Sequence, residues 1–73
     1  MNIKTKIEVY DSGACAVELT DSVNGTLLFK TSTMTEQEAY NYCLGVNEAE
    51  TIDLSDAKKL EGFQKAIAIL TNG

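Results

Sequence analysis

Apolar and polar residues alternate along the first part of the chain. From Ile3 to Tyr10 every second side chain suits a protein core, which predicts a half-buried β-strand over residues 3–10. The same period predicts further strands over residues 14–21 and 26–32. The side chains expected to face the core are Ile3, Thr5, Ile7, Val9, Cys15, Val17, Leu19, Leu27, Phe29 and Thr31. The residues between them, Ala16 included, form the opposite, open face of the sheet.

Two turns that end in glycine set the expected register of these strands. Residues 11–13 and 23–25 both read as three-residue hairpin loops whose glycine takes the left-handed conformation. Such loops make the inward residues of neighbouring strands meet, and they place Leu19 opposite Phe29. A two-residue turn at the second site would oppose Leu19 with Lys30 and would need a bulge to repair the pattern. The three-residue interpretation is therefore preferred.

After residue 32 the apolar spacing changes to that of helices. Thr35 and Glu38 have the spacing of a capping box, which predicts a helix over residues 36–44 that Gly45 ends. A second helix is predicted over residues 54–70, with Asp53 or Ser55 as its N-cap. The expected inner faces are Ala39, Tyr40, Cys43 and Leu44 in the first helix, and Ala57, Leu60, Phe63, Ile67 and Leu70 in the second.

The order of these elements predicts the fold class. Three strands followed by two helices indicate an α+β fold, with a three-stranded antiparallel sheet and two helices packed on one face. The 73 residues form a single domain, 1–73, because a second core would need roughly 50 more residues. A chain of this length buries only about 60% of its unfolded surface, so its core is thin.

The composition argues against an enzyme. The sequence has no histidine and no arginine, which removes the commonest proton-transfer group and the usual clamp for phosphate or carboxylate. Cys15 and Cys43 are too few for a tetrahedral metal site without histidine, so neither a metal nor a cofactor is expected. Both fall on inward positions, which favours inert core thiols over the alternatives of a disulfide or a reactive cysteine.

The net charge of −5 points to a class of partner. It opposes direct contact with nucleic acid and favours a protein partner that has a basic, nucleic-acid-binding surface. The N-terminal residues lack the apolar segment of a signal peptide, and the chain has no apolar run of membrane-spanning length. We therefore expect a cytoplasmic protein with reduced thiols and no membrane contact.

The open sheet face supplies the first candidate binding site. Its members are Lys6, Glu8, Tyr10, Glu18 and Lys30. Lys6 and Lys30 flank Glu18, an arrangement that also occurs in ordinary solvated sheets, where cross-strand ion pairs stabilise the fold. Tyr10 favours a binding role, because a large outward aromatic beside carboxylates is typical of an interface anchor with a polar rim.

A stretch without basic residues supplies a second, acidic candidate site. It contains Glu36, Glu38, Glu48 and Glu50. Helix starts favour acidic residues for dipole reasons alone, which accounts for the first two without any function. The alternative is an acidic edge that docks on a basic surface.

Several short segments follow one another as they do in a known family. They are Ile7-Glu8-Val9-Tyr10, Gly13, Val17-Glu18, Val23-Asn24-Gly25 and Thr35-Glu36-Gln37. In this order, over about residues 7 to 45, the chain resembles small phage anti-CRISPR proteins that block the type I-F surveillance complex. The family's additional leading strand, which carries a further binding tyrosine, has no counterpart in this sequence. The second helix shows little likeness.

The resemblance implies a function and a partner. Members of the family bind the repeated Cas backbone subunits of a crRNA-guided complex, so that target DNA cannot hybridise. Tyr10 and Glu18 match a tyrosine and a glutamate of the family's binding face. The expected function is therefore a phage or mobile-element inhibitor that acts by steric and acidic occlusion in the host cytoplasm. The alternative is a small phage structural or regulatory interaction module without a CRISPR target.

Overall fold

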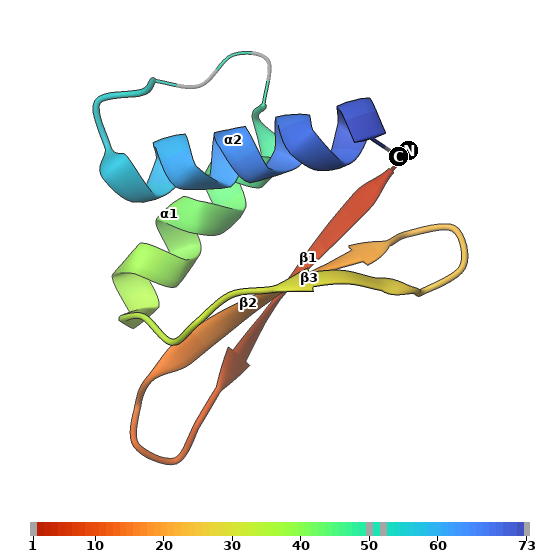
Figure 1. The fold of residues 1–73 in the computed structure, drawn as a ribbon. Helices are drawn as coiled ribbons and strands as arrows, with labels where there is room; N and C mark the ends of the chain where they lie inside the picture. Colours follow the sequence, from red (N-terminus) through yellow and green to blue (C-terminus); the bar gives the residue numbers. More distant parts are fainter. Residues whose placement is uncertain (1, 50, 52, 73) are drawn as a thin grey trace.

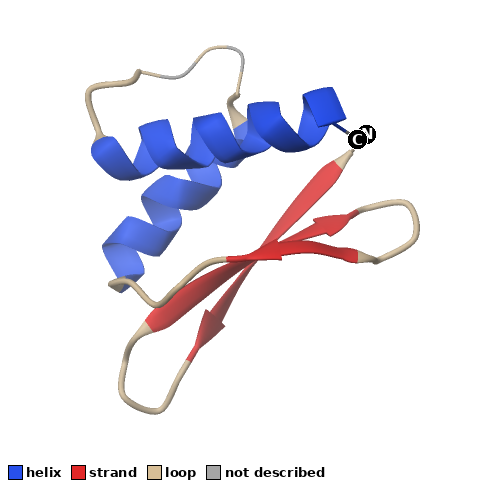
Figure 2. Cartoon of the chain, viewed as in Figure 1, coloured by secondary structure: helices blue, strands red, loops and turns tan. Residues whose placement is uncertain are grey.

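The computed structural model describes residues 2–49, 51 and 53–72. The elements are β1 (Ile3–Val9), β2 (Cys15–Asp21), β3 (Leu27–Lys30), α1 (Glu36–Asn47) and α2 (Ala57–Asn72). The strands form an antiparallel sheet in the order β1-β2-β3. Both helices lie on the same side of this sheet (Figures 1 and 2). The α+β class with a three-stranded antiparallel sheet is confirmed.

The first hairpin has the predicted turn and register. The Tyr10 amide donates to the Ala14 carbonyl and the Gly13 amide donates to the Tyr10 carbonyl, both at 2.9 Å. Gly13 has a φ of 87°, which a side chain would strain. Val17 consequently lies opposite Ile7.

The second hairpin differs from the prediction at its tip. Leu19 does lie opposite Phe29, but Asp21 rather than Ser22 pairs with Thr26, so the loop has four residues, 22–25. The Asp21 carboxylate accepts a hydrogen bond from the Val23 amide at 2.8 Å, and this side-chain turn starts the loop one residue early. A register shift between Leu19 and Thr20 absorbs the difference as a β-bulge.

The bulge moves one predicted core residue to the other face of the sheet. Leu27 pairs with Thr20, which belongs to the open face, and is 54% exposed. The expectation that Leu27 points toward the core is therefore wrong. Val9 is also exposed, at 66%, because the β1–β2 hairpin extends beyond the start of α1 (Figure 1).

Helix α1 begins as predicted and ends later. Its capping box is present: the Glu38 amide donates to the Thr35 hydroxyl at 3.1 Å, and the Thr35 amide donates to the Glu38 carboxylate at 3.2 Å. The helix continues through Gly45 to Asn47. Gly45 is therefore not a cap, and it is needed for another reason, because the Lys59 carbonyl occupies the place where a Cβ would lie.

Helix α2 begins later than predicted and has a different cap. The Asp56 carboxylate accepts from the amides of Lys58 and Lys59, at 2.9 and 3.1 Å, and so caps a helix that starts at Ala57. Asp53, one of the two expected caps, accepts from the Ser55 amide in the preceding turn instead.

The inner faces of both helices are rotated from the predicted ones. Tyr42 is fully buried in α1, whereas Tyr40 is 55% exposed. In α2 the buried residues are Gly62 and Ala66, while Ile67 and Leu70 are 38% and 43% exposed. The cause is the close crossing of the helices, which turns their small residues toward each other.

One hydrophobic core joins the sheet to the helices. Its buried members are Cys15, Val17, Leu19, Met34, Ala39, Tyr42, Cys43, Val46, Ala49 and Ala66, with Ile3, Ile7, Phe29, Phe63 and Ile69 packed around them. Both cysteines are free and buried, which agrees with the expectation of core thiols.

Candidate interaction surface on the open sheet face

The register brings three of the predicted site residues into one row. Lys6 of β1 lies opposite Glu18 of β2, and Glu18 lies opposite Lys30 of β3. The alternating pattern points all three side chains to the face that the helices leave uncovered. This row is the one expected from the sequence.

Lys30 reaches beyond its neighbour to the far strand. Its Nζ lies 2.7 Å from Glu8 Oε2 on β1 and 3.7 Å from Glu18 Oε1. To make the shorter contact the side chain crosses β2 beside Ala16, which pairs with Glu8. A larger residue at this position would obstruct the crossing.

Ala16 lies on the open face as predicted, but its burial was not predicted. It was expected to lie accessible on the open face, but only 1% of it is exposed. The covering is explained by the long side chains that meet above it, because Lys30 and Glu8 come from the strands on either side of β2. The available signal was that the predicted sheet places the small Ala16 on β2, between the strands that carry the long, oppositely charged Glu8 and Lys30.

Tyr10 completes the cluster at its edge. Its hydroxyl donates to Glu8 Oε2 at 3.5 Å, and Lys30 Nζ lies 5.7 Å from the centre of its ring. The ring thus has a cation beside it and a carboxylate at its hydroxyl. Tyr10 remains 36% exposed, so its ring is held in place and still accessible to a partner.

Electrostatic coupling keeps the cluster charged. The hydrogen bond from Lys30, with a smaller contribution from Glu18, lowers the pKa of Glu8 below its ordinary value of 4.5. The same contact with Glu8, followed by Tyr10, raises the pKa of Lys30 above its ordinary value. Both groups are therefore ionised at neutral pH.

The face as a whole is not acidic. Lys4, Lys6 and Lys30 lie on it, against Glu8 and Glu18. Its net charge is therefore slightly positive, and the chain's charge of −5 arises from other surfaces. This distribution separates two properties that the sequence interpretation had combined, namely the tyrosine-containing face and the acidity.

The predicted acidic site is not one cluster. Glu36 and Glu38 lie in the first turn of α1, whereas Glu48 is its C-cap, at the other end of a helix of 12 residues. Glu38 is already used, because it closes the capping box and lies 3.7 Å from Lys58 Nζ. Glu50 lies outside the described residues.

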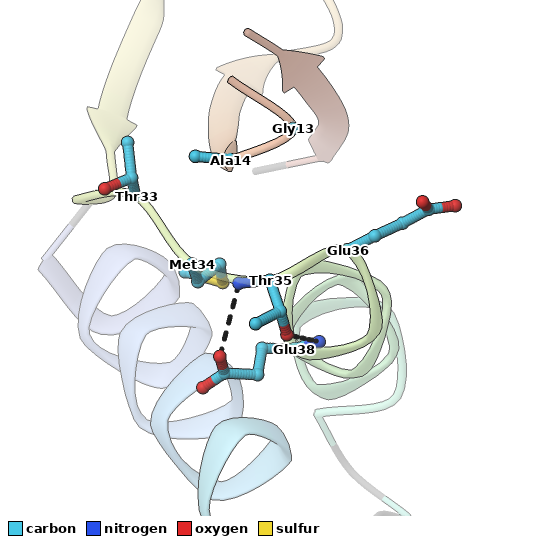
Figure 3. Close-up of a pocket in the computed structure, with 7 residues that line it drawn as sticks. All are labelled: Gly13, Ala14, Thr33, Met34, Thr35, Glu36 and Glu38. Carbon is cyan, nitrogen blue, oxygen red and sulfur yellow. Dashed lines mark hydrogen bonds between the residues drawn. The ribbon is translucent and has the colours of Figure 1, made fainter. Parts of the chain in front are cut away.

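The surface hollows offer little chemistry. One of about 400 Å³ lies between the first hairpin and the start of α1 and is lined by Gly13, Ala14, Thr33, Met34, Thr35, Glu36 and Glu38. Figure 3 shows Glu38 turned back to the Thr35 amide and Glu36 pointing away. Among the described residues, no group of three or more acidic or cysteine side chains could hold a metal ion.

No helix in the described part of the chain is both long and apolar enough to cross a membrane. Comparison of the chain with protein family models, with curated proteins and with solved structures found no match. The open sheet face is therefore interpreted from its own residues and from the motifs of the sequence.

Proposed function

We propose that this chain is a non-catalytic inhibitor that docks on a protein through its open sheet face. The supporting observation is the cluster of Tyr10, Glu8, Glu18 and Lys30, in which an accessible aromatic ring lies beside the ion pair of Glu8 and Lys30. Anchors of protein interfaces combine a rigid aromatic with a polar rim in this way. Preorganisation lowers the entropy lost on binding.

The proposed partner is the Cas backbone of a type I crRNA-guided surveillance complex. The sequence motifs around Tyr10 and Glu18 support this identity through their resemblance to type I-F inhibitors. The chain's charge adds a physical reason, since a net charge of −5 is attracted to a surface that otherwise holds nucleic acid. The inhibitor would occupy that surface and prevent target DNA from hybridising.

The charge distribution gives two surfaces of the chain separate roles in binding. The acids away from the open face would speed the approach to a basic groove, an effect that salt weakens. The open face, with mixed charge, would then set the orientation of the bound chain. Steric occlusion by this face and acidic steering by the rest are thus separable in experiment.

The test measures target DNA binding by a purified type I surveillance complex in the presence of this chain. The chain should abolish the electrophoretic mobility shift of the target DNA. Tyr10→Ala should weaken inhibition by at least about 30-fold, because it removes a central anchor that contributes ~2 kcal/mol to binding. Tyr10→Phe keeps the ring and should lose much less. Glu18→Gln is the matched charge variant, because a lysine there would stand between Lys6 and Lys30.

Glu48→Gln is the control for charge. It removes the same charge from the C-terminal end of α1, and it should alter inhibition by less than about 3-fold at physiological salt. If Glu48→Gln weakens inhibition as much as Glu18→Gln does, long-range acidity rather than the sheet face drives binding. If the wild-type chain binds no type I complex, the proposed partner is wrong.

The second candidate function is an interaction module that assembles without a CRISPR target. The observation that favours it is the outer edge of β1, which no other strand of the described residues covers.

A further inference from the structure

Strand β1 has a free edge over its whole length. The sheet order β1-β2-β3 gives it one neighbour among the described residues. The Tyr10 amide bonds to Ala14, and the Asn2 carbonyl accepts from the Ser22 amide, so the even-numbered residues direct their backbone groups toward β2. By the alternation of antiparallel ladders, Thr5, Ile7 and Val9 direct theirs outward. Among the described residues, the odd-numbered positions of this seven-residue strand therefore present an unpaired row of backbone donors and acceptors.

We propose that β1 pairs with β1 of a second copy of this chain, antiparallel and centred on Ile7. In this register Lys6 faces the partner's Glu8, and the twofold symmetry repeats the pair. Lys4 faces the partner's Tyr10, which places a cation beside an aromatic ring. The backbone pairs are Ile7 with Ile7, and Thr5 with Val9 twice, which supply about six main-chain hydrogen bonds.

Charge complementarity selects this register. Centring the pair on Lys6 would place two lysines against each other, and centring it on Glu8 would oppose two glutamates. Centring it on Thr5 would oppose Lys4 with Lys6. Like charges directly opposite each other destabilise a sheet, so these repulsions act against pairing in all three registers. The register centred on Ile7 meets none of these repulsions and, unlike a pair centred on Val9, places opposite charges against each other.

Three observations on the single chain support a second copy as the partner of this edge. Neither Lys4 nor Lys6 takes part in the ion pairs found among the described residues. Val9 is 66% exposed at the same edge. On the helix side, a hollow of about 370 Å³ beside Ile7 and the exposed Tyr40 leaves room for the partner's Ile7. The dimer would extend the open face across both copies, and it does not depend on the proposed CRISPR target.

Sedimentation equilibrium of the whole chain tests the pairing. At about 100 µM we expect a mass of twice the 7.9 kDa of one chain. Val9→Pro should give a monomer with unchanged helix content, because the lost amide points outward and the proline blocks two of the three backbone pairs. A wild-type chain that remains monomeric at about 1 mM overturns the proposal.

A charge swap tests the contact between Lys6 and Glu8. Lys6→Glu and Glu8→Lys should each raise the dimer dissociation constant at least about 10-fold, and the double variant should return to within about 3-fold of wild type. Lys59→Glu, in the first turn of α2, changes the net charge as Lys6→Glu does and should leave the dissociation constant unchanged. Because Glu8 also pairs with Lys30 and Lys6 lies opposite Glu18 in the same chain, the double variant is compared only if its urea midpoint matches that of wild type, and its failure to recover then refutes the register.

Oxidative crosslinking tests the centre of symmetry. Ile7→Cys places two thiols opposite each other at a backbone separation of about 5.5 Å, which suits a disulfide. Val9→Cys, made together with Cys15→Ser because Cys15 lies opposite Val9 in β2, is the matched control: its position is more exposed, but it faces the partner's Thr5. A covalent dimer should form with Ile7→Cys and not with Val9→Cys. The reverse result would overturn the proposed register, even if a dimer exists.

Discussion

The crossing of α1 and α2 makes an unusual prediction about Gly45. In an ordinary helix interior, replacing glycine with alanine stabilises the helix by about 1 kcal/mol. Here the added Cβ would overlap the backbone carbonyl of Lys59, and at the facing position Gly62 the added Cβ would overlap the carbonyl of Tyr42. Backbone atoms cannot rotate aside as side chains do, so the helices must separate. Gly45→Ala should therefore destabilise the protein.

The magnitude follows from two opposing contributions. Overpacking of a close contact costs about 1–3 kcal/mol, and the upper end applies because the obstacle is backbone and because separation loosens the packing around the fully buried Ala66. Subtracting the gain in helix propensity of about 1 kcal/mol leaves a net loss near 2 kcal/mol. This is a large part of the ~5 kcal/mol expected for a domain of this size.

Urea unfolding followed by far-ultraviolet circular dichroism measures the effect. With a slope of about 1 kcal/mol per molar urea, the midpoint of Gly45→Ala should fall by about 2 M. Ala68→Gly, at an exposed position of α2, is the control that reports the intrinsic difference between the two residues and should cost about 1 kcal/mol. A Gly45→Ala variant as stable as wild type would show that the helices do not cross closely at this residue.

Three further predictions concern buried and titrating groups. Tyr42→Phe should raise the free energy of unfolding by about 1 kcal/mol in the same urea assay, because the Tyr42 hydroxyl is buried without a partner among the described residues. Hydrogen bonds from Thr35 lower the pKa of Glu38 from its ordinary 4.5, so its contribution to stability is complete above that pH and is lost as the pH falls through the lower folded-state value. Glu38→Gln keeps the capping interaction without titrating, so the urea midpoint of this variant should fall less steeply with decreasing pH than that of wild type. An identical pH dependence of the two midpoints would contradict this. Cys15 and Cys43 are buried, and burial raises the pKa of the Cys43 thiol, so both should react with a thiol reagent only after denaturant is added, whereas fast labelling of the native protein would refute their burial.

The candidate site was only partly predictable. The register of the first hairpin and the pairing around Leu19 placed Glu18 between Lys6 and Lys30, as the alternation indicated. The structure was needed to show that Lys30 bonds most closely to Glu8, two strands away. This contact depends on how the three strands lie together and on the space above Ala16. The separation of Glu36 and Glu38 from Glu48 already follows from the predicted helix between them, and the structure adds that α1 runs on to Asn47, which makes Glu48 its C-cap.

The amino-acid sequence by itself determined the α+β class, the first hairpin and the start of α1. Each of these depends on contacts within a few residues: the side-chain period, a glycine with positive φ at position 13, and the capping box of Thr35 and Glu38. Only the tertiary structure decided where α1 ends and which faces of the helices are buried. Gly45 reads locally as a helix end, but α2 approaches so closely there that a side chain has no room. The same residue that would terminate an isolated helix thus permits the crossing that builds the core.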